Sequence, residues 1–209
     1  MHKPSSILYN RKQNLLMNVL IPVKSLSTAK SRLNKSLSPD ERKKLVIKML
    51  DHVITVIQSC KGISQITVVT PDEKIKKHVR EKGVTVLSEE RPGYNESLTQ
   101  AALHEKGNAV LTIAADLPLL TANDINFLLQ LAKSHEVVLA PAKDGGTNAV
   151  VMKFSLLIPY LFGEKSFENY KKIAKEKNFT IGVYQSETIA FDIDTEEDLK
   201  KFQQIQNLF

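Results

Sequence analysis

Residues 109–118 read AVLTIAADLP, an apolar run that is followed at once by an acidic residue, Asp116, and by Pro118. A continuous apolar run of this length is typical of a strand that is covered on both faces, as in parallel sheets. The proline prevents the strand from simply continuing. We therefore expect residues 109–114 to form a central strand of an α/β fold, with Asp116 just beyond its carboxyl end.

On both sides of this run, short β-rich segments alternate with segments of helical periodicity. This alternation predicts an α/β fold of three layers, in which a mostly parallel, twisted sheet has helices on both faces. One helix begins at residues 38–41, Ser-Pro-Asp-Glu, which combine an N-cap serine, a proline at the first helical position and a capping-box glutamate. The expected strands are 19–23, 66–70, 84–87, 109–114, 137–140, 148–153, 180–184 and 188–193, and the other expected helices are 72–81, 94–105, 121–133, 167–176 and one that begins at 195.

The composition is that of an ordinary globular protein, with 209 residues, 42% of them hydrophobic, and a formal net charge of +6. The single cysteine, Cys60, cannot form an internal disulfide, so we expect a reducing compartment and a cytoplasmic location. No apolar stretch reaches the roughly 18 residues that a membrane helix needs, and we expect no membrane association. Basic residues are not interleaved with aromatic ones, which disfavours nucleic acid, whereas the mild positive charge suits either an anionic small molecule or solubility alone.

The chain contains no internal repeat and no linker, which favours one domain over residues 18–209. Residues 1–17 show neither alternation nor helical periodicity. We expect them to be an N-terminal extension, either a mobile arm or a segment that precedes an alternative start at Met17. The sequence leaves the oligomeric state open, with a homodimer as one option.

Candidate ligand-binding residues follow the ends of the predicted strands, where open α/β sheets bind their ligands. Lys24, Lys30 and Arg32 lie in the loop after the first strand. These cations could neutralise a triphosphate, and a solvated basic loop is the alternative interpretation. The patterns GxxxxGK[ST] and GxGxxG are both missing, which disfavours a P-loop NTPase and a dinucleotide enzyme.

Acidic residues follow two of the predicted strands: Asp116 after the central one, and Asp192 and Asp194 at the end of the last. Mg²⁺ is commonly held by one or two carboxylates together with substrate phosphates. In a strand, residues i and i+2 point the same way, so either Asp192 or Asp194 could reach a metal beside Asp116. Asp116 taken alone could equally cap a turn.

Two further segments combine glycines with neutral hydrogen-bond donors: residues 140–149, which include Gly145-Gly146-Thr147-Asn148, and residues 162–167, which include Gly163 and Ser166. Such loops let backbone N–H groups approach a phosphate or carboxylate, which would indicate an anionic acceptor. A plain hairpin turn is the alternative for the two glycines. Residues 91–97, RPGYNES, could form a turn with a helix cap, or an edge where the Asn95 amide contacts a base.

Together these residues resemble the 2-phospho-L-lactate guanylyltransferases of coenzyme F420 biosynthesis, a branch of the nucleotidyltransferase fold related to the molybdenum-cofactor guanylyltransferases. The chain departs from that family at Tyr94, where the family has leucine between glycine and asparagine. The resemblance spans about residues 18–201 and rests on seven motifs in order: IPVK…AKSRL at 21–33, LSPDER at 37–42, PGYN at 92–95, ADLPLL at 115–120, DGGTNA at 144–149, FGEKS at 162–166 and DIDTEEDL at 192–199.

The resemblance implies a nucleotide-diphospho-sugar transferase-like fold and transfer of GMP from GTP to the phosphate of 2-phospho-L-lactate or phosphoenolpyruvate, with release of pyrophosphate. It implies Mg²⁺ as the cofactor, and GTP and a small phosphorylated carboxylic acid as the ligands. Another nucleotidyltransferase, with a sugar-phosphate or pterin acceptor, and a non-catalytic nucleotide-binding subunit are the alternatives. The implied roles are Lys24, Lys30 and Arg32 on the triphosphate and, with Asp116, in catalysis; Asp116 with Asp192 or Asp194 on Mg²⁺; Gly93 and Asn95 on the nucleoside; and Thr147, Asn148, Gly163 and Ser166 on the acceptor.

Overall fold

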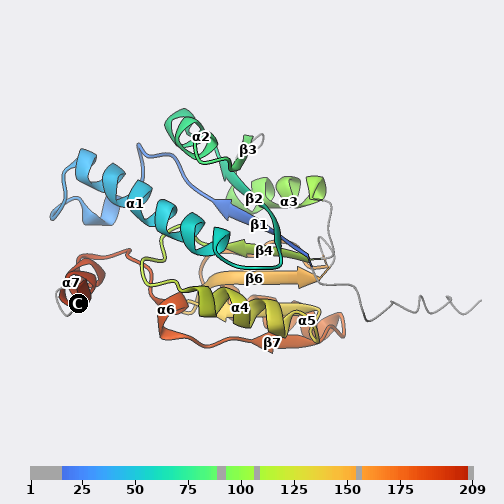
Figure 1. Ribbon diagram of the computed structural model, residues 1–209. Coiled ribbons are helices and arrows are strands. Elements are labelled where there is room, and N and C mark those ends of the chain that lie inside the picture. Colours follow the sequence, from blue (N-terminus) through green and yellow to red (C-terminus); the bar gives the residue numbers. More distant parts are fainter. Residues whose placement is uncertain (1–15, 89–92, 106–108, 154–156, 207–209) are drawn as a thin grey trace, which may run out of the picture.

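A computed structural model of the chain describes residues 16–88, 93–105, 109–153 and 157–206, and within them seven strands form a single sheet (Figure 1). The sheet order is β3-β2-β1-β4-β6-β5-β7. β6 runs antiparallel to its neighbours β4 and β5, and the other paired strands are parallel, which confirms a mostly parallel sheet. The strands are β1 (Met17–Pro22), β2 (Ile63–Thr70), β3 (Thr85–Ser88), β4 (Ala109–Ile113), β5 (Val137–Pro141), β6 (Thr147–Lys153) and β7 (Ile181–Val183).

Helices follow most of the strands, and some of them begin at a side chain that caps the first turn, namely Ser38, Asp72 and Thr121. The capping box at Ser38 is confirmed: its hydroxyl accepts from the Glu41 N–H, and the Glu41 carboxylate accepts from the Ser38 N–H at 2.8 Å. The helices are α1 (Pro39–Gln58), α2 (Glu73–Arg80), α3 (Tyr94–His104), α4 (Ala122–Leu131), α5 (Ser166–Glu176), α6 (Glu187–Ala190) and α7 (Glu196–Gln206), with one 3₁₀ turn, Ser31–Leu33, before α1.

The two faces of the sheet are covered by different helices because neighbouring strand residues point to opposite faces. In β1, Val19 and Ile21 share a buried cluster with side chains of α1, α2 and α4. Leu20, between them, belongs to a second cluster with side chains of α3 and α5. The three-layer prediction is therefore confirmed. β4 is the fourth of the seven strands, and all five of its residues are buried, as expected of the central strand.

The expected strand at residues 188–193 is wrong. Thr188 lies in the short helix α6, and residues 191–195 form a loop that joins no strand. The Ser186 and Thr188 hydroxyls both donate to the buried Asp124 carboxylate, at 2.7 and 2.8 Å. These hydrogen bonds stabilise a turn of helix that the β-branched composition of the segment does not indicate.

At the other end of the domain, β1 begins at Met17, two residues before the expected start. Met17 is completely buried, and its N–H donates to the Gly62 carbonyl at 2.9 Å. The sheet thus includes a residue that the sequence pattern assigned to the extension, and residues 1–15 of that extension lie outside the described residues. None of the helices in the described ranges is long and apolar enough to cross a membrane.

Asp124 joins the segment before the 191–195 loop to α4, so its removal should weaken the whole domain. The Asp124→Ala variant leaves the Tyr184, Ser186 and Thr188 hydroxyls without their acceptor. We expect a loss of about 3 kcal/mol in the free energy of unfolding, measured by urea denaturation. Asp40→Ala, which removes an exposed carboxylate from the first turn of α1, is the control. Equal midpoints for the two variants would contradict this role.

Candidate active site

Three aspartates from distant parts of the chain meet at one edge of the sheet. Asp116 follows the carboxyl end of β4, and Asp192 and Asp194 lie in the loop between α6 and α7. One carboxylate oxygen of each lies within 4.8 Å of the others. In Figure 1 the arrowheads of β1 and β4 point towards the side where α7 lies, so this is the ligand-binding edge expected of an open α/β sheet.

Lys30 lies between two of these carboxylates. Its Nζ is 2.5 Å from Asp116 Oδ2 and 2.7 Å from Asp194 Oδ1, and its side chain is only 9% exposed. Burial alone would lower the pKa of Lys30, but the two carboxylates outweigh it and raise that pKa. The backbone of Lys30 is left-handed, with φ 50°, a conformation that non-glycine residues seldom adopt. The chain is thus turned so that this ammonium reaches the acidic cluster.

The carboxylates have unequal surroundings. Burial would raise the pKa of Asp194, but Lys30, with help from Arg32 at 3.9 Å, lowers it. The pKa of Asp192 is raised, first by burial and then by the Asp116 carboxylate. Within the described residues, Asp192 Oδ1 is buried and accepts no hydrogen bond, and the Lys143 ammonium lies 3.3 Å from it. A buried carboxylate oxygen that accepts no hydrogen bond is unfavourable, and an additional cation beside it would stabilise the charged carboxylate.

Lys143 is a site residue that the sequence interpretation missed. Its Nζ donates to the Asp192 carbonyl at 2.6 Å and to Asp198 Oδ1 at 2.5 Å, and it lies 5.0 Å above the Phe191 ring. Lys143 therefore fixes the path of residues 191–195, the acidic loop. In the sequence, Lys143 directly precedes Asp144-Gly145-Gly146. That position alone does not distinguish a lysine that binds carboxylates from one that is exposed to solvent.

Apolar packing holds residues 23–33, the basic loop with Lys24, Lys30 and Arg32, against the acidic loop. Leu33, next to Arg32, and Ile193, between the two aspartates, are both completely buried in one small cluster with Met49 of α1 and Leu199 of α7. Because neither loop is part of the sheet, this cluster fixes their relative position.

The predicted nucleoside residues Gly93 and Asn95 are the sequence neighbours of Tyr94, which lies at a second part of this edge. Lys24 Nζ lies 5.5 Å above the ring of Tyr94, and both border a cavity of 130 Å³ at the carboxyl ends of β1 and β2. Gly93 has a φ of +127°, which favours glycine. The Asn95 amide donates to the Phe162 carbonyl at 3.1 Å and accepts from the Phe162 N–H at 2.9 Å, so this side chain joins α3 to the segment before Gly163. Arg91 and Pro92 of the same motif lie outside the described residues.

The predicted acceptor residues lie in two segments that contact each other. Ser166 donates to Thr147 Oγ1 at 3.0 Å, and both side chains are buried. The Asn148 amide donates to the Ile189 carbonyl at 2.9 Å, so it fastens β6 to α6. Gly145 and Gly146 lie in the hairpin between β5 and β6, the alternative that the sequence left open. Gly163, with φ +129°, is exposed and has open space beside its Cα.

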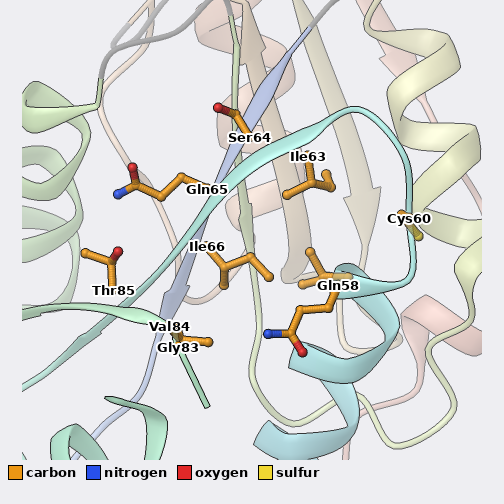
Figure 2. A pocket seen from close by; sticks show the side chains of 10 residues that line it. Gln58, Cys60, Ile63, Ser64, Gln65, Ile66, Gly83, Val84 and Thr85 are labelled. Carbon is orange, nitrogen blue, oxygen red and sulfur yellow. The ribbon is translucent and has the colours of Figure 1, made fainter. Parts of the chain in front are cut away.

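A larger cavity of 310 Å³ lies at the opposite, amino end of β2 and is unsuited to phosphates. Figure 2 shows its lining, which comes from the end of α1, the start of β2 and the start of β3. The lining contains amides, hydroxyls, aliphatic groups and the free thiol of Cys60, and no charged side chain. Since a phosphate site needs cations or aligned N–H donors, the edge with Lys24, Lys30 and Arg32 is the candidate active site.

Comparisons with known proteins show which family this chain resembles. The family model described as guanylyl transferase CofC like matches residues 17–204. The chain is 35% identical over 186 residues to phosphoenolpyruvate guanylyltransferase of Sphaerobacter thermophilus, covering 87% of this chain and 90% of that one. It is 33% identical to 2-phospho-L-lactate guanylyltransferase of Methanocaldococcus jannaschii, covering 88% and 80%.

A solved structure shares the fold at low sequence identity. It is that of a protein from Desulfovibrio desulfuricans G20, described as a candidate nucleotide-diphospho-sugar transferase. Its TM-score is 0.77 at 14% identity, covering 91% of this chain and 87% of that one. The nucleotide-diphospho-sugar transferase-like fold is therefore confirmed.

Asp198 allows the electrostatics of the acidic loop to be tested by pH. Burial would raise its pKa, but hydrogen bonds from Lys143 and Thr195 lower the pKa from 3.8 to about 2. A carboxyl with a lowered folded-state pKa stabilises the fold above the unfolded-state pKa and loses that effect as the pH falls through the folded-state value. Asp198→Asn should therefore cost about 2 kcal/mol of unfolding free energy near pH 7, and about half of that at pH 3.

Urea denaturation of the wild type and Asp198→Asn at both pH values measures this difference. Glu197→Gln, which removes the neighbouring exposed carboxylate of α7, is the control and should show little dependence on pH. A cost for Asp198→Asn that is the same at pH 7 and pH 3 would contradict the assigned role of the Lys143 contact.

Proposed function

This chain belongs to the CofC-like guanylyl transferase family, and we propose that it transfers GMP from GTP to the phosphate of phosphoenolpyruvate or 2-phospho-L-lactate in coenzyme F420 biosynthesis, releasing pyrophosphate. The observation that carries the proposal is the cluster of Asp116, Asp192 and Asp194 with the Lys30 ammonium in contact, at the ligand-binding edge of the sheet. Carboxylates for a divalent cation and lysines for phosphates are the groups that nucleotidyl transfer requires.

Asp116, together with Asp192 or Asp194, would hold Mg²⁺, whose preferred ligands are oxygens. The fit is supported by the short separations of their oxygens and by the buried Asp192 Oδ1, which accepts no hydrogen bond from the described residues. A bound Mg²⁺ would supply positive charge to the phosphate oxygens of GTP.

The chain's own residues position the reactants and neutralise charge. An oxygen of the acceptor phosphate attacks the α-phosphorus of GTP in line, and the bond from that phosphorus to the oxygen bridging to the β-phosphate breaks. Pyrophosphate leaves with the electron pair, so no side-chain nucleophile is needed. Lys24, Lys30 and Arg32 bind the triphosphate and stabilise the charge that develops on the leaving group.

The remaining predicted residues divide between the two ligands. We place the nucleoside beside Gly93 and Asn95, and the acceptor beside Thr147, Asn148, Gly163 and Ser166. The hydrogen bonds of Asn95, Asn148 and the Ser166–Thr147 pair support a positioning role for these side chains, while exposed Gly163 leaves backbone accessible to the acceptor. We place the reaction in the cytoplasm, consistent with the free Cys60 thiol, and the homodimer stays a prediction.

The acceptor and the nucleotide can be identified in one assay. Pyrophosphate release is measured with GTP, ATP, CTP or UTP, each with phosphoenolpyruvate, 2-phospho-L-lactate, a hexose 1-phosphate or no acceptor, in the presence of Mg²⁺. We expect release with GTP and one or both of the three-carbon acceptors, because both present a phosphate beside a carboxylate. Release only with the hexose 1-phosphate, or nucleotide binding without any release, would contradict the proposal.

Asp116 is the carboxylate whose loss should be most severe, because it faces both Lys30 and the other two aspartates. Asp116→Asn should lower kcat by at least about a hundredfold while the circular dichroism spectrum and the unfolding midpoint stay close to those of the wild type. Asp192→Asn and Asp194→Asn, assayed over a range of Mg²⁺ concentrations, show which aspartate of the loop binds the metal. Asp40→Asn, an exposed carboxylate in the first turn of α1, is the matched control. Wild-type turnover by Asp116→Asn would contradict the assignment.

A further inference from the structure

Asp72 makes two sets of hydrogen bonds that point in different directions. It follows the carboxyl end of β2 and is the N-cap of α2. Its Oδ1 accepts from the N–H groups of Lys74 and Ile75, at 2.9 and 3.3 Å, as an N-cap does. Its Oδ2 accepts from the Leu26 N–H at 2.8 Å and from the Ser25 hydroxyl at 3.2 Å. The second set has no part in capping the helix.

Ser25 and Leu26 lie in the basic loop, directly after Lys24 and four residues before Lys30. The loop leaves the sheet at Val23, whose N–H donates to the Val69 carbonyl at 2.9 Å. Further along the loop, the Leu26 N–H donates to the Asp72 carboxylate, and the Leu26 side chain is buried in the hydrophobic core. Asp72 therefore fixes the backbone at the point where the loop turns from Lys24 towards Lys30.

A carboxylate near a triphosphate site repels the ligand, so a helix cap alone would be better supplied there by serine or asparagine. Four donors, three backbone N–H groups and the Ser25 hydroxyl, stabilise the charged form of Asp72 in this place. Burial would raise the pKa of Asp72, yet the bonds from Leu26, Ile75 and Lys74 lower it, which indicates that the charged form is the one bound.

We propose that Asp72 is a positioning residue for GTP: by holding Ser25 and Leu26, it sets the path of the basic loop so that Lys24 and Lys30 face the triphosphate. This inference rests on the proposed function and adds to it a residue outside the acidic cluster and the basic loop. Asp72 acts on the ligand through the loop, so its loss should affect GTP binding and leave the acceptor unaffected.

Two variants separate positioning from capping. Asp72→Ser keeps an N-cap oxygen for α2, but its shorter side chain cannot also reach the Leu26 N–H. Asp72→Asn keeps the size of the side chain but has a single acceptor oxygen, so one of the two sets of bonds is lost. Asp51→Asn is the matched control. Asp51 contacts His78 of α2 at 2.7 Å and Lys82, just after α2, at 3.3 Å, and among the described interactions it contacts no residue of the basic loop.

We expect the KM for GTP to rise about tenfold in Asp72→Ser, the effect of losing a hydrogen bond to a charged group, while the KM for the acceptor stays within about twofold. Asp51→Asn should leave both KM values unchanged. A merely structural role for Asp72 would instead lower the active fraction, and hence the apparent kcat, with no change in the KM for GTP. That result would overturn the proposal.

Two measurements that do not depend on catalytic turnover test the role of Asp72 independently of the proposed function. Calorimetry with inorganic pyrophosphate as the probe should show about tenfold weaker binding to Asp72→Ser than to the wild type or Asp51→Asn. Hydrogen exchange should be faster over residues 23–33 in Asp72→Ser only. If the wild type releases no pyrophosphate from GTP, the proposed function fails, but unchanged pyrophosphate affinity and exchange in Asp72→Ser are what would refute the role of Asp72.

Discussion

The contact of the Lys30 ammonium with Asp116 and Asp194 is the interaction on which the site depends. It joins a residue near the start of the domain to carboxylates 86 and 164 positions further along the chain. Three carboxylates with oxygens this close would repel one another strongly, and Lys30 and Lys143 supply the charge that keeps them together. The left-handed backbone at Lys30 and the buried cluster around Leu33 and Ile193 are the features that make the contact possible.

Three further side chains at the same edge hold neighbouring segments together by hydrogen bonds. Asp72 fixes the basic loop to β2 and α2, Lys143 fixes the acidic loop to the β5–β6 hairpin, and Asn95 fixes α3 to the segment before Gly163. The basic loop, the acidic loop and the segment before Gly163 are not strands of the sheet. Their side-chain hydrogen bonds therefore determine where the charged groups of the proposed GTP and acceptor sites lie.

Much of the fold could be predicted from the sequence because it depends on local patterns. The run at 109–114 indicates a buried central strand, and Ser38 with Glu41 marks the start of α1. The segment 188–193 was predicted wrongly because its conformation depends on Asp124, more than sixty residues away, which accepts from Ser186 and Thr188. The meeting of Asp116 with Asp192 and Asp194 was predicted, and their oxygens do lie close together. The reason given for Asp192 and Asp194 was wrong, however, because they lie in a loop and not at the end of a strand. The roles of Lys143 and Asp72 could not be predicted, because nothing in their neighbouring residues shows what they contact.

The central claim is that Asp116, together with Asp192 or Asp194, forms one divalent-cation site for GTP, and a crystal structure with Mn²⁺ and GTP tests it most directly. Mn²⁺ prefers the same oxygen ligands as Mg²⁺ and is located by its anomalous scattering. We expect a single peak about 2 Å from oxygens of Asp116 and of at least one of the other two aspartates, with a GTP phosphate oxygen also bound. A peak on the phosphates alone, with no oxygen of Asp116, Asp192 or Asp194 within bonding distance of the Mn²⁺, would contradict the account.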